Sequence, residues 1–231
     1  MQHDKPARPP GIHAQTIGEC WLGSIRYVLN HGQPHHDGEV GLIELLGLAV
    51  EITAPREEDP IILAHGDPAV VTRTLAKFAR GASMPERPFT YGQRIFDMDG
   101  VDQLDWMVER LLRKPDTKSA TINLLVTGST AAGLPCLTTL DAKIRRGQLD
   151  LQFFFRSQNI FGRQYANLAA LARLQSDLAR RCNTVSGVLR GYVASAHIYA
   201  FDIDDARKLI VGAPIRIADR YHELGPRPSG A

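Results

Sequence analysis

The sequence has little of what marks membrane, secreted or metal-binding proteins. Its 231 residues contain no apolar run near the roughly 20 residues that span a bilayer, so no membrane helix is expected. The first 15 residues are polar and proline-rich and lack the apolar segment of a secretory signal. Only three cysteines are present, at scattered positions, which is typical of a reducing compartment and matches no zinc pattern. We therefore expect a cytoplasmic protein that binds no metal and no membrane.

The sequence also lacks a strong charge of either sign. Its 27 Lys and Arg residues nearly balance 25 Asp and Glu residues, so the net charge of +2 gives no field that would attract a nucleic-acid polymer. Apolar residues make up 44% and charged residues 23%, as in folded globular proteins rather than disordered ones. The length suits one large domain. We expect a flexible arm over residues 1–15, a single domain over 16–224 and a short tail over 225–231.

The periodicity of apolar residues indicates both helices and strands. Spacings of three and four predict helices over these segments: 16–29, 67–78, 104–112 and 167–181. Apolar or alternating runs predict strands within 35–52, over 121–126 and over 185–199. Two further runs, 137–144 and 148–155, flank Arg145-Arg146-Gly147 and predict an antiparallel hairpin. Together these elements predict an α+β fold, a single domain in which a mostly antiparallel or mixed sheet packs against helices.

The candidate nucleophile is Cys136, which follows a small-residue loop and Pro135 at the start of a predicted strand. Such a position can present a thiol to a pocket, and a thiolate needs a positive neighbour to form near neutral pH. Arg156 supplies that charge if the hairpin brings the two residues together. The alternative is a structural cysteine, because cysteine is among the most often buried residues. Cys20 and Cys182 lie within helical patterns and are expected to be structural.

Several polar side chains further along the chain are candidates for binding a ligand. Asn167 offers a paired donor and acceptor that suits the edge of a pyrimidine ring, although capping of the helix that it begins is the alternative. His197 and Tyr199 alternate along a strand, so both can face one side and bind a sugar hydroxyl, with a core histidine as the alternative. His35 and His36 lie at a turn without the partners that a metal site needs, so a solvated pair is expected.

These residues occur in a fixed order with several others. Twenty positions separate Cys136 from Arg156, eleven separate Arg156 from Asn167, and thirty separate Asn167 from His197. The combination resembles the thymidylate synthase family over roughly residues 90 to 210, and the N-terminal part is similar to the short archaeal-type members. The resemblance rests on these matches: Tyr91-Gly92, Asp102-Gln103, Pro135-Cys136, Gln152, Arg156-Ser157, Asn167 and Ala196-His197-Ile198-Tyr199.

The resemblance implies a thymidylate synthase-like fold and one-carbon transfer from 5,10-methylenetetrahydrofolate to C5 of a pyrimidine nucleotide or nucleoside. Cys136 would attack C6 of the ring, Arg156 would assist the thiolate, and Tyr91 would order water for proton transfer. Hydride from the folate would then give a methyl group, or water a hydroxymethyl group. A homodimer is implied as well. The resemblance also implies these substrate contacts: Arg156 and Ser157 with the phosphate, Asn167 with the base, His197 and Tyr199 with the ribose, and Gln152 with the substrate.

Departures from the family pattern bear on the substrate and the cofactor. The family has paired arginines that reach the phosphate across the dimer, whereas this chain has Asp116-Thr117-Lys118-Ser119, which leaves Lys118 as the cation. Residues 37–44 contain no Lys or Arg where the family has an arginine loop. Asn159 stands where the family has an aspartate that contacts the pterin. The family's catalytic glutamate lies on an apolar helix before the Tyr-Gly motif, whereas the only glutamate between Ile61 and Tyr91 here is Glu86, in a predicted loop, so that role is not assigned to a residue.

These departures leave two hypotheses. The first is methylation or hydroxymethylation of a pyrimidine in a specialised, modified-nucleoside pathway. Asn167 favours a uracil-type base in that case, because family members that prefer cytosine often carry aspartate there. The second hypothesis is a non-catalytic or repurposed member of the family that binds a pyrimidine nucleotide, and the retention of Cys136 argues against it.

Overall fold

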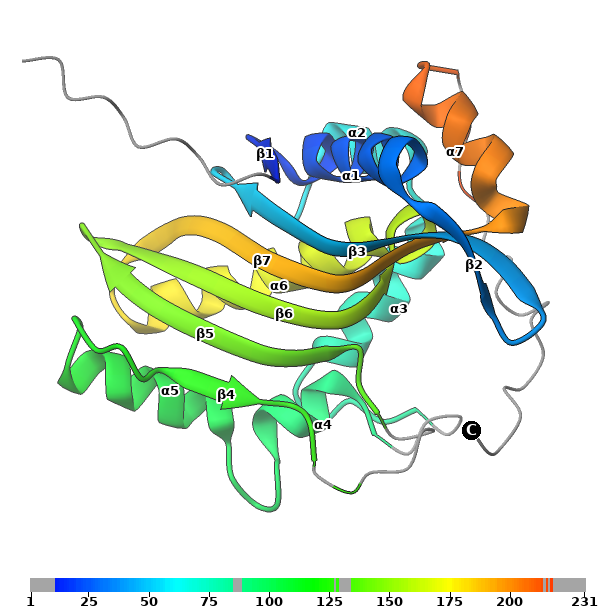
Figure 1. Ribbon diagram of the computed structural model, residues 1–231. Helices are drawn as coiled ribbons and strands as arrows, with labels where there is room; N and C mark the ends of the chain where they lie inside the picture. The colour runs from blue at the N-terminus through cyan, green and yellow to red at the C-terminus, as the bar shows by residue number, and fades with distance from the viewer. Residues whose placement is uncertain are drawn as a thin grey trace, which may run out of the picture.

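A computed structural model of the protein describes residues 11–84, 89–126, 128, 134–213, 215 and 217 (Figure 1). The helices are α1 (Ile17–His31), α2 (Pro60–His65), α3 (Pro68–Phe78), α4 (Tyr91–Phe96), α5 (Gln103–Arg113), α6 (Ile160–Arg181) and α7 (Ile203–Ile210). The strands are β1 (Ile12–Ala14), β2 (Gln33–Asp37), β3 (Val40–Ile52), β4 (Thr121–Asn123), β5 (Leu137–Arg145), β6 (Gln148–Asn159) and β7 (Val185–Tyr199). Within the described ranges, no helix is long and apolar enough to cross a membrane.

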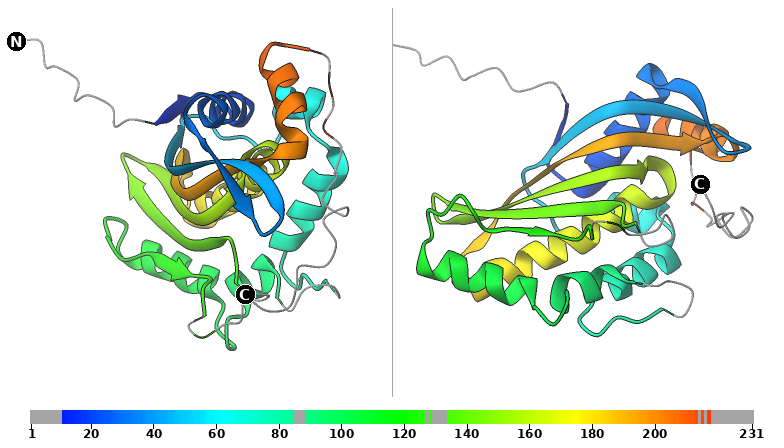
Figure 2. Two further views of the ribbon diagram at one scale, coloured as in Figure 1. Left: turned by 45° about the vertical axis from the view of Figure 1, so that its right-hand side comes forward. Right: turned by 60° about the horizontal axis from the view of Figure 1, so that its bottom comes forward.

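The described strands form one mixed sheet. Their order is β1-β3-β7-β6-β5-β4, and β2 pairs with β3 in a hairpin that projects beyond one end of the sheet (Figure 1). The pairs β1–β3 and β6–β7 are parallel, and the other neighbours are antiparallel. The sheet curves around α6 (Figure 2), while α1 packs along β3 and α5 along β4. This arrangement confirms the predicted single α+β domain.

Local sequence signals account for the ends of several elements. Thr16 begins α1 in a capping box with Glu19, and Pro68 occupies the first turn of α3. In the β5–β6 hairpin, the turn residues Arg146 and Gly147 have φ angles of 52° and 74°, as a type I′ turn requires. The first three predicted helices and the predicted hairpin are therefore confirmed.

The start of α6 differs from the expectation of a helix that begins at Asn167. The helix begins at Ile160, and Asn159 caps it by accepting a hydrogen bond of 2.8 Å from a backbone N–H of the first turn. Trp21 of α1 donates its indole N–H to the carbonyl oxygens of Ile160 and of the following residue, both at 3.1 Å. That contact joins distant parts of the chain, so spacing along the sequence does not predict it. Asn167 lies inside the helix, and the prediction that it begins the helix is wrong.

The strands at the two edges of the sheet also differ from expectation. β4 covers three residues with alternating burial, so the predicted buried strand over 121–126 is too long. It is an edge strand, which explains its shortness. At the other edge, Ile12 of β1 pairs with Val50 of β3, so the predicted arm over residues 1–15 extends too far. Residues 1–10 and the predicted tail over 225–231 lie outside the described residues.

Three neighbouring strands, β3, β7 and β6, share one irregularity. In a regular strand, the side chains that face the core recur with a period of two. In these strands, two successive core-facing side chains are at one point three residues apart, and we call this point the step. Beyond the step, positions that would have faced the core face the opposite side of the sheet. Gly47 lies at the step in β3 with a φ of 82°, in the left-handed region that favours glycine. The step occurs at paired positions: Leu45 to Leu48 in β3, Val193 to Ala196 in β7 and Phe155 to Gln158 in β6. Strand β5 has a separate bulge between Leu137 and Thr139, opposite Phe154 and Phe155 of β6.

The junction between α3 and α4 is closely packed. A Cβ added to Gly92, in the first turn of α4, would lie 2.0 Å from the carbonyl oxygen of Ala79, the residue that ends α3. The rings of Phe78 and Tyr91 lie side by side across this junction, with centroids 4.6 Å apart. The absence of a side chain at Gly92 therefore lets α4 approach α3 and fixes the position of Tyr91.

We expect Gly92→Ala to lower the free energy of unfolding by about 1–2 kcal/mol. Overpacking costs about 1–3 kcal/mol, and alanine in place of glycine in a helix recovers about 1 kcal/mol at most. Gly41→Ala is the control, because a Cβ there meets nothing closer than 3.6 Å; it should change stability by less than about 0.5 kcal/mol. Urea denaturation measures both, and equal stabilities for the two variants would contradict the packing argument.

Candidate active site

One end of the sheet gathers most of the predicted site residues. At this end β3 and β5 begin while β6 and β7 finish, as the register of Asn159 with His197 and of His197 with Glu44 fixes. Because the alternation of side chains is inverted beyond the step, Ser157 and His197 share the face of the sheet that points away from the helical core.

The hairpin brings Cys136 and Arg156 together. The backbone N–H of Arg156 donates to the carbonyl oxygen of Cys136 at 2.8 Å. The Arg156 guanidinium donates through Nε to the carbonyl oxygen of Pro135 at 3.0 Å and through an Nη to that of Leu134 at 3.3 Å. Cys136 is half-buried, and its Sγ lies 3.6 Å from the Ser157 Oγ. The sulfur therefore lies beside a hydroxyl, on a segment that an arginine holds in place.

Tyr91 lies beside the same segment. Its phenolic oxygen accepts a hydrogen bond of 3.3 Å from the backbone N–H of Leu137, one residue after Cys136. Arg94, in the same helix, is buried and donates to the carbonyl oxygen of Leu124. Burial lowers the pKa of Arg94, against an opposing electrostatic effect of Tyr91. Helix α4 thus contacts both the chain after β4, through Arg94, and the segment that carries Cys136, through Tyr91.

The other two cysteines differ from Cys136 in their surroundings. Burial raises the pKa of the Cys20 thiol to about 12, although a hydrogen bond with Ser24 opposes the shift. Burial also raises the pKa of Cys182, and the charge of Arg181 opposes that shift. Thiols with raised pKa values contain little of the reactive thiolate. Both thiols are buried, and their raised pKa values favour the structural role expected from the sequence.

The far side of the site contains two hydrogen bonds from hydroxyl groups to carboxylates. Ser195 Oγ donates to Glu44 Oε1, and Tyr199 Oη donates to Asp37 Oδ2 at 3.4 Å. The rings of His197 and Tyr199 lie 5.1 Å apart, so these two residues share one side of β7 as their alternation predicts. Sequence reasoning does not identify the two carboxylates, because cross-strand pairing brings them here. The sequence feature that could have indicated them is the absence of Lys and Arg from residues 37–44, where the acidic residues have no basic neighbour.

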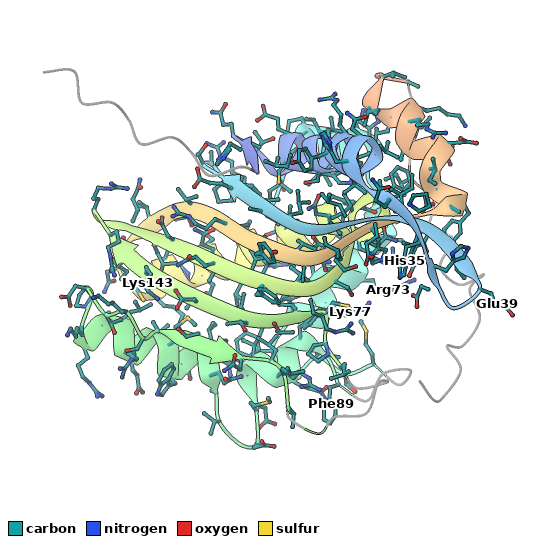
Figure 3. The ribbon with its side chains drawn as sticks, in the orientation of Figure 1. His35, Glu39, Arg73, Lys77, Phe89 and Lys143 are labelled. Carbon is teal, nitrogen blue, oxygen red and sulfur yellow. The ribbon has the colours of Figure 1, made fainter. Side chains whose placement is uncertain are left out.

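Cations border this end of the sheet. Figure 3 shows Arg73 and Lys77 on α3, toward the end from which the β2–β3 hairpin projects. The two residues are one helical turn apart, and Lys77 immediately precedes Phe78, which packs on Tyr91. Glu86, the only glutamate between Ile61 and Tyr91, lies outside the described residues. Within the described ranges, no group of three His, Cys, Asp or Glu side chains is arranged to hold a metal ion.

Comparison with known proteins assigns the family. A family model described as Thymidylate synthase matches residues 73–218, more than half of the chain. The chain belongs to the thymidylate synthase family. A relative from Methanococcoides burtonii, named "Putative thymidylate synthase", is 31% identical over 209 residues, which cover 87% of this chain and 94% of that protein. A protein of the same name from Methanothermobacter marburgensis is 32% identical over 219 residues, which cover 86% of this chain and 97% of that protein. Thymidylate synthase of phage T4 is 27% identical over 135 residues, 56% of this chain and 46% of the phage protein.

In this member of the thymidylate synthase family, the two asparagines near the site have different surroundings. Asn159 is buried, and its side-chain oxygen is engaged in the cap of α6. Asn167 lies about two turns further along α6 and is half-buried. It makes no hydrogen bond through its side chain to any residue that the structure describes. The amide of Asn167 is therefore available to a ligand, whereas the oxygen of Asn159 is held by the helix.

Gln152 and Lys118 lie away from Cys136 within the subunit. Gln152 is four residues before the arginine of the site, about 13 Å along β6, and donates to Asp141 at 3.2 Å. Lys118 is exposed and follows Thr117, whose carbonyl oxygen accepts a hydrogen bond from Arg145 at the far end of β5. That end is about 25–30 Å from the start of the strand. The structure therefore separates these two predicted substrate contacts from the others.

We expect iodoacetamide to alkylate Cys136 well before the other cysteines in the folded protein at pH 8. The raised pKa values keep Cys20 and Cys182 protonated, and for Cys20 this protection should persist up to a pH near 12 if the fold survives. Peptide mass mapping after timed labelling measures the order. In denaturant all three cysteines should react alike. Labelling of Cys20 first in the folded state would contradict this assignment.

Proposed function

We propose that the protein transfers a one-carbon unit from 5,10-methylenetetrahydrofolate to C5 of a pyrimidine nucleotide or nucleoside, through a covalent adduct with Cys136. The observation that carries the proposal is the position of the Cys136 sulfur, half-buried and 3.6 Å from the Ser157 hydroxyl, on the segment that Arg156 holds. Membership of the thymidylate synthase family supports one-carbon transfer to pyrimidine C5 in general.

Each residue of the site has a step in this proposal. The Cys136 thiolate attacks C6 of the ring, which makes C5 a nucleophile. The Ser157 hydroxyl donates to the sulfur when the C–S bond breaks again, and Arg156 contributes positive charge. Tyr91, hydrogen-bonded to the residue after the cysteine, orders water for removal of the C5 proton. Asn167 binds the edge of the base through its side-chain amide.

The folate supplies the one-carbon unit and, for a methyl product, the hydride. The residues at this end of the sheet fit such a molecule. Arg73 and Lys77 form a pair of cations on α3 that suits the carboxylates of the folate glutamate. Asn159 lies at the same end, as the pterin contact implied by the family requires, and its oxygen is already bound in the cap of α6.

The product in this proposal is a methyl or a hydroxymethyl group, and the exclusion of water decides between them. A uracil-type base fits Asn167, which carries an amide where a carboxyl would suit cytosine. A role in a modified-nucleoside pathway fits the missing paired arginines and the remote position of Lys118. The second candidate is a repurposed nucleotide-binding protein, favoured by the engagement of Asn159 in a helix cap.

We expect incubation with methylenetetrahydrofolate and a panel of pyrimidine nucleotides and nucleosides to modify one of them. Mass spectrometry would find a gain of about 14 mass units for a methyl product, or about 30 for the hydroxymethyl product that forms when water adds before hydride transfer. Cys136→Ala should abolish the reaction while the far-ultraviolet circular dichroism stays unchanged. Undiminished turnover in that variant would contradict the covalent mechanism, and an inert panel would favour the binding protein.

We also propose that two copies pair through the open face of the sheet. On that face Leu46, Phe154 and Tyr192 are 73%, 38% and 43% exposed. The rings of Phe154 and Tyr192 stack with centroids 5.7 Å apart. An exposed apolar patch of this kind is typical of an interface. Pairing would also give Lys118, remote from the cysteine of its own subunit, a possible place near the partner's site.

Sedimentation equilibrium tests the pairing directly. We expect a dimer at micromolar concentration, and we expect Leu46→Glu to shift the equilibrium to monomer because it places a charge within the apolar patch. Glu109→Gln, on the exposed surface of α5, is the control and should leave the dimer intact. A monomer at all concentrations for the unaltered protein would contradict the proposal.

A further inference from the structure

The end of the sheet opposite the candidate active site contains a cavity. It lies where β3 ends and β7 begins, away from the β2–β3 hairpin (Figure 1), and its volume of about 410 Å³ is in the range of small-molecule sites. The loop after β3, the second half of α6 and the start of β7 line it. Along β7, Ser186 at the cavity is nine residues, about 30 Å, from Ser195, the partner of Ser157 beside the cysteine. The cavity is therefore separate from the site around Cys136.

Helical spacing explains which side chains of α6 reach this cavity. Arg173, Ser176, Asp177 and Arg180 line it, and because they are three or four residues apart they lie on one face of the helix. Leu178, between them in the sequence, is fully buried in the core. The amphipathic pattern of α6 therefore directs polar side chains to the cavity while its apolar side packs against the sheet.

The cavity contains one more cation than its ion pairs neutralise. Arg173 lies 3.5 Å from Glu57, and Arg180 pairs with Asp177 of its own helix. Arg56 lines the same cavity and makes no ion pair with any residue that the structure describes. Pairs between exposed side chains contribute at most about 1 kcal/mol, so a bound anion can also compete for the two paired arginines.

Two hydroxyl groups add further donors. Ser176 of α6 and Ser186 of β7 line the cavity, and neither hydroxyl forms a hydrogen bond within the described part of the chain. A hydroxyl donates to phosphate and carboxylate oxygens alike. Hydrogen-bond donors therefore approach one space from a loop, a helix and a strand.

The loop that carries Arg56 is held on both sides of this residue. Before it, the backbone N–H of Thr53 donates to the carbonyl oxygen of Ala14 at 3.1 Å. After it, the buried carboxylate of Asp59 caps α2 and accepts a hydrogen bond of 2.9 Å from the backbone N–H of Gly18. A loop that is already ordered loses less conformational entropy when a ligand binds. The backbone at the unpaired arginine is thus preorganised.

We propose that this cavity is a second ligand site, which binds a small anion through phosphate or carboxylate groups, with Arg56 as the main contact. The planar guanidinium group binds the oxygens of either group through two parallel hydrogen bonds. Arg173, Arg180 and the two serine hydroxyls supply the remaining donors. The proposal is independent of the one-carbon chemistry, because the cavity shares no residue with the site around Cys136.

Isothermal titration calorimetry at low ionic strength tests the site, with pyrophosphate and citrate as probes. We expect saturable binding of at least one probe, and the tighter one assigns phosphate or carboxylate ligands. Arg56→Gln removes the unpaired charge and should weaken this binding about tenfold or more, because charge-assisted hydrogen bonds are the stronger class. Arg113→Gln makes the same change on the exposed surface of α5, away from the cavity, and should leave the affinity unchanged. Lys77→Gln, near the hairpin end of the sheet, should leave it unchanged as well (Figure 3).

Three results would overturn the inference. The first is the absence of both binding heat and a rise in melting temperature with either probe. The second is equal affinity of Arg56→Gln and Arg113→Gln, which would reflect net charge alone. The third is a loss of binding in Lys77→Gln that Arg56→Gln does not show, which would place the anion at the other end of the sheet. Circular dichroism verifies the fold of each variant, and the pyrimidine panel tests the one-carbon transfer separately.

Discussion

The shared step in three strands is the constraint on which the site depends. A single strand that shifted its alternation would lose register with its neighbours, and every side chain beyond the shift would change face. Because β3, β7 and β6 make the step at paired positions, these strands stay in register and their side chains change face together. Ser157 and His197 consequently point away from the helices, toward the face where Cys136 meets Ser157.

Arg156 lies at this step in β6 and links it to the cysteine. Its backbone N–H still donates to Cys136, so the irregularity leaves this polar group satisfied. Its guanidinium holds the two residues before the cysteine by their carbonyl oxygens, which the planar fork of arginine does better than lysine would. An arginine that positions a nucleophile in this way has fewer N–H groups left for a substrate, which makes the charge of the neighbouring strands more important for specificity.

The sequence predicts those features that nearby residues determine. The capping box of Thr16 and Glu19 and the turn of Arg146 and Gly147 are local signals, and both appear in the structure. The sequence does not predict the start of α6, because no glycine or proline separates the end of β6 from the helix. In addition, Trp21 contacts this point from far away in the chain. The sequence does not predict the step in the strands either. In one strand the break in alternation has no evident meaning, and only the pairing with neighbouring strands shows that they break at the same position. The carboxylates near His197 are likewise not predicted, because they come from other strands and reach His197 only through strand pairing.

The departures from the family pattern lie at several places, and their nature bears on the choice between an enzyme and a binding protein. The groups closest to the proposed chemistry remain together, with Cys136 beside Ser157 and Tyr91 bound to the residue that follows the cysteine. The departures instead concern groups that would bind a phosphate or the folate, namely the hairpin without Lys or Arg, the remote Lys118 and Asn159, whose oxygen caps α6. Loss of catalysis would leave no reason for the cysteine to keep a hydroxyl, an arginine-held loop and a phenol around it. Departures among the binding groups beside a retained nucleophile and its neighbours favour an enzyme over a binding protein.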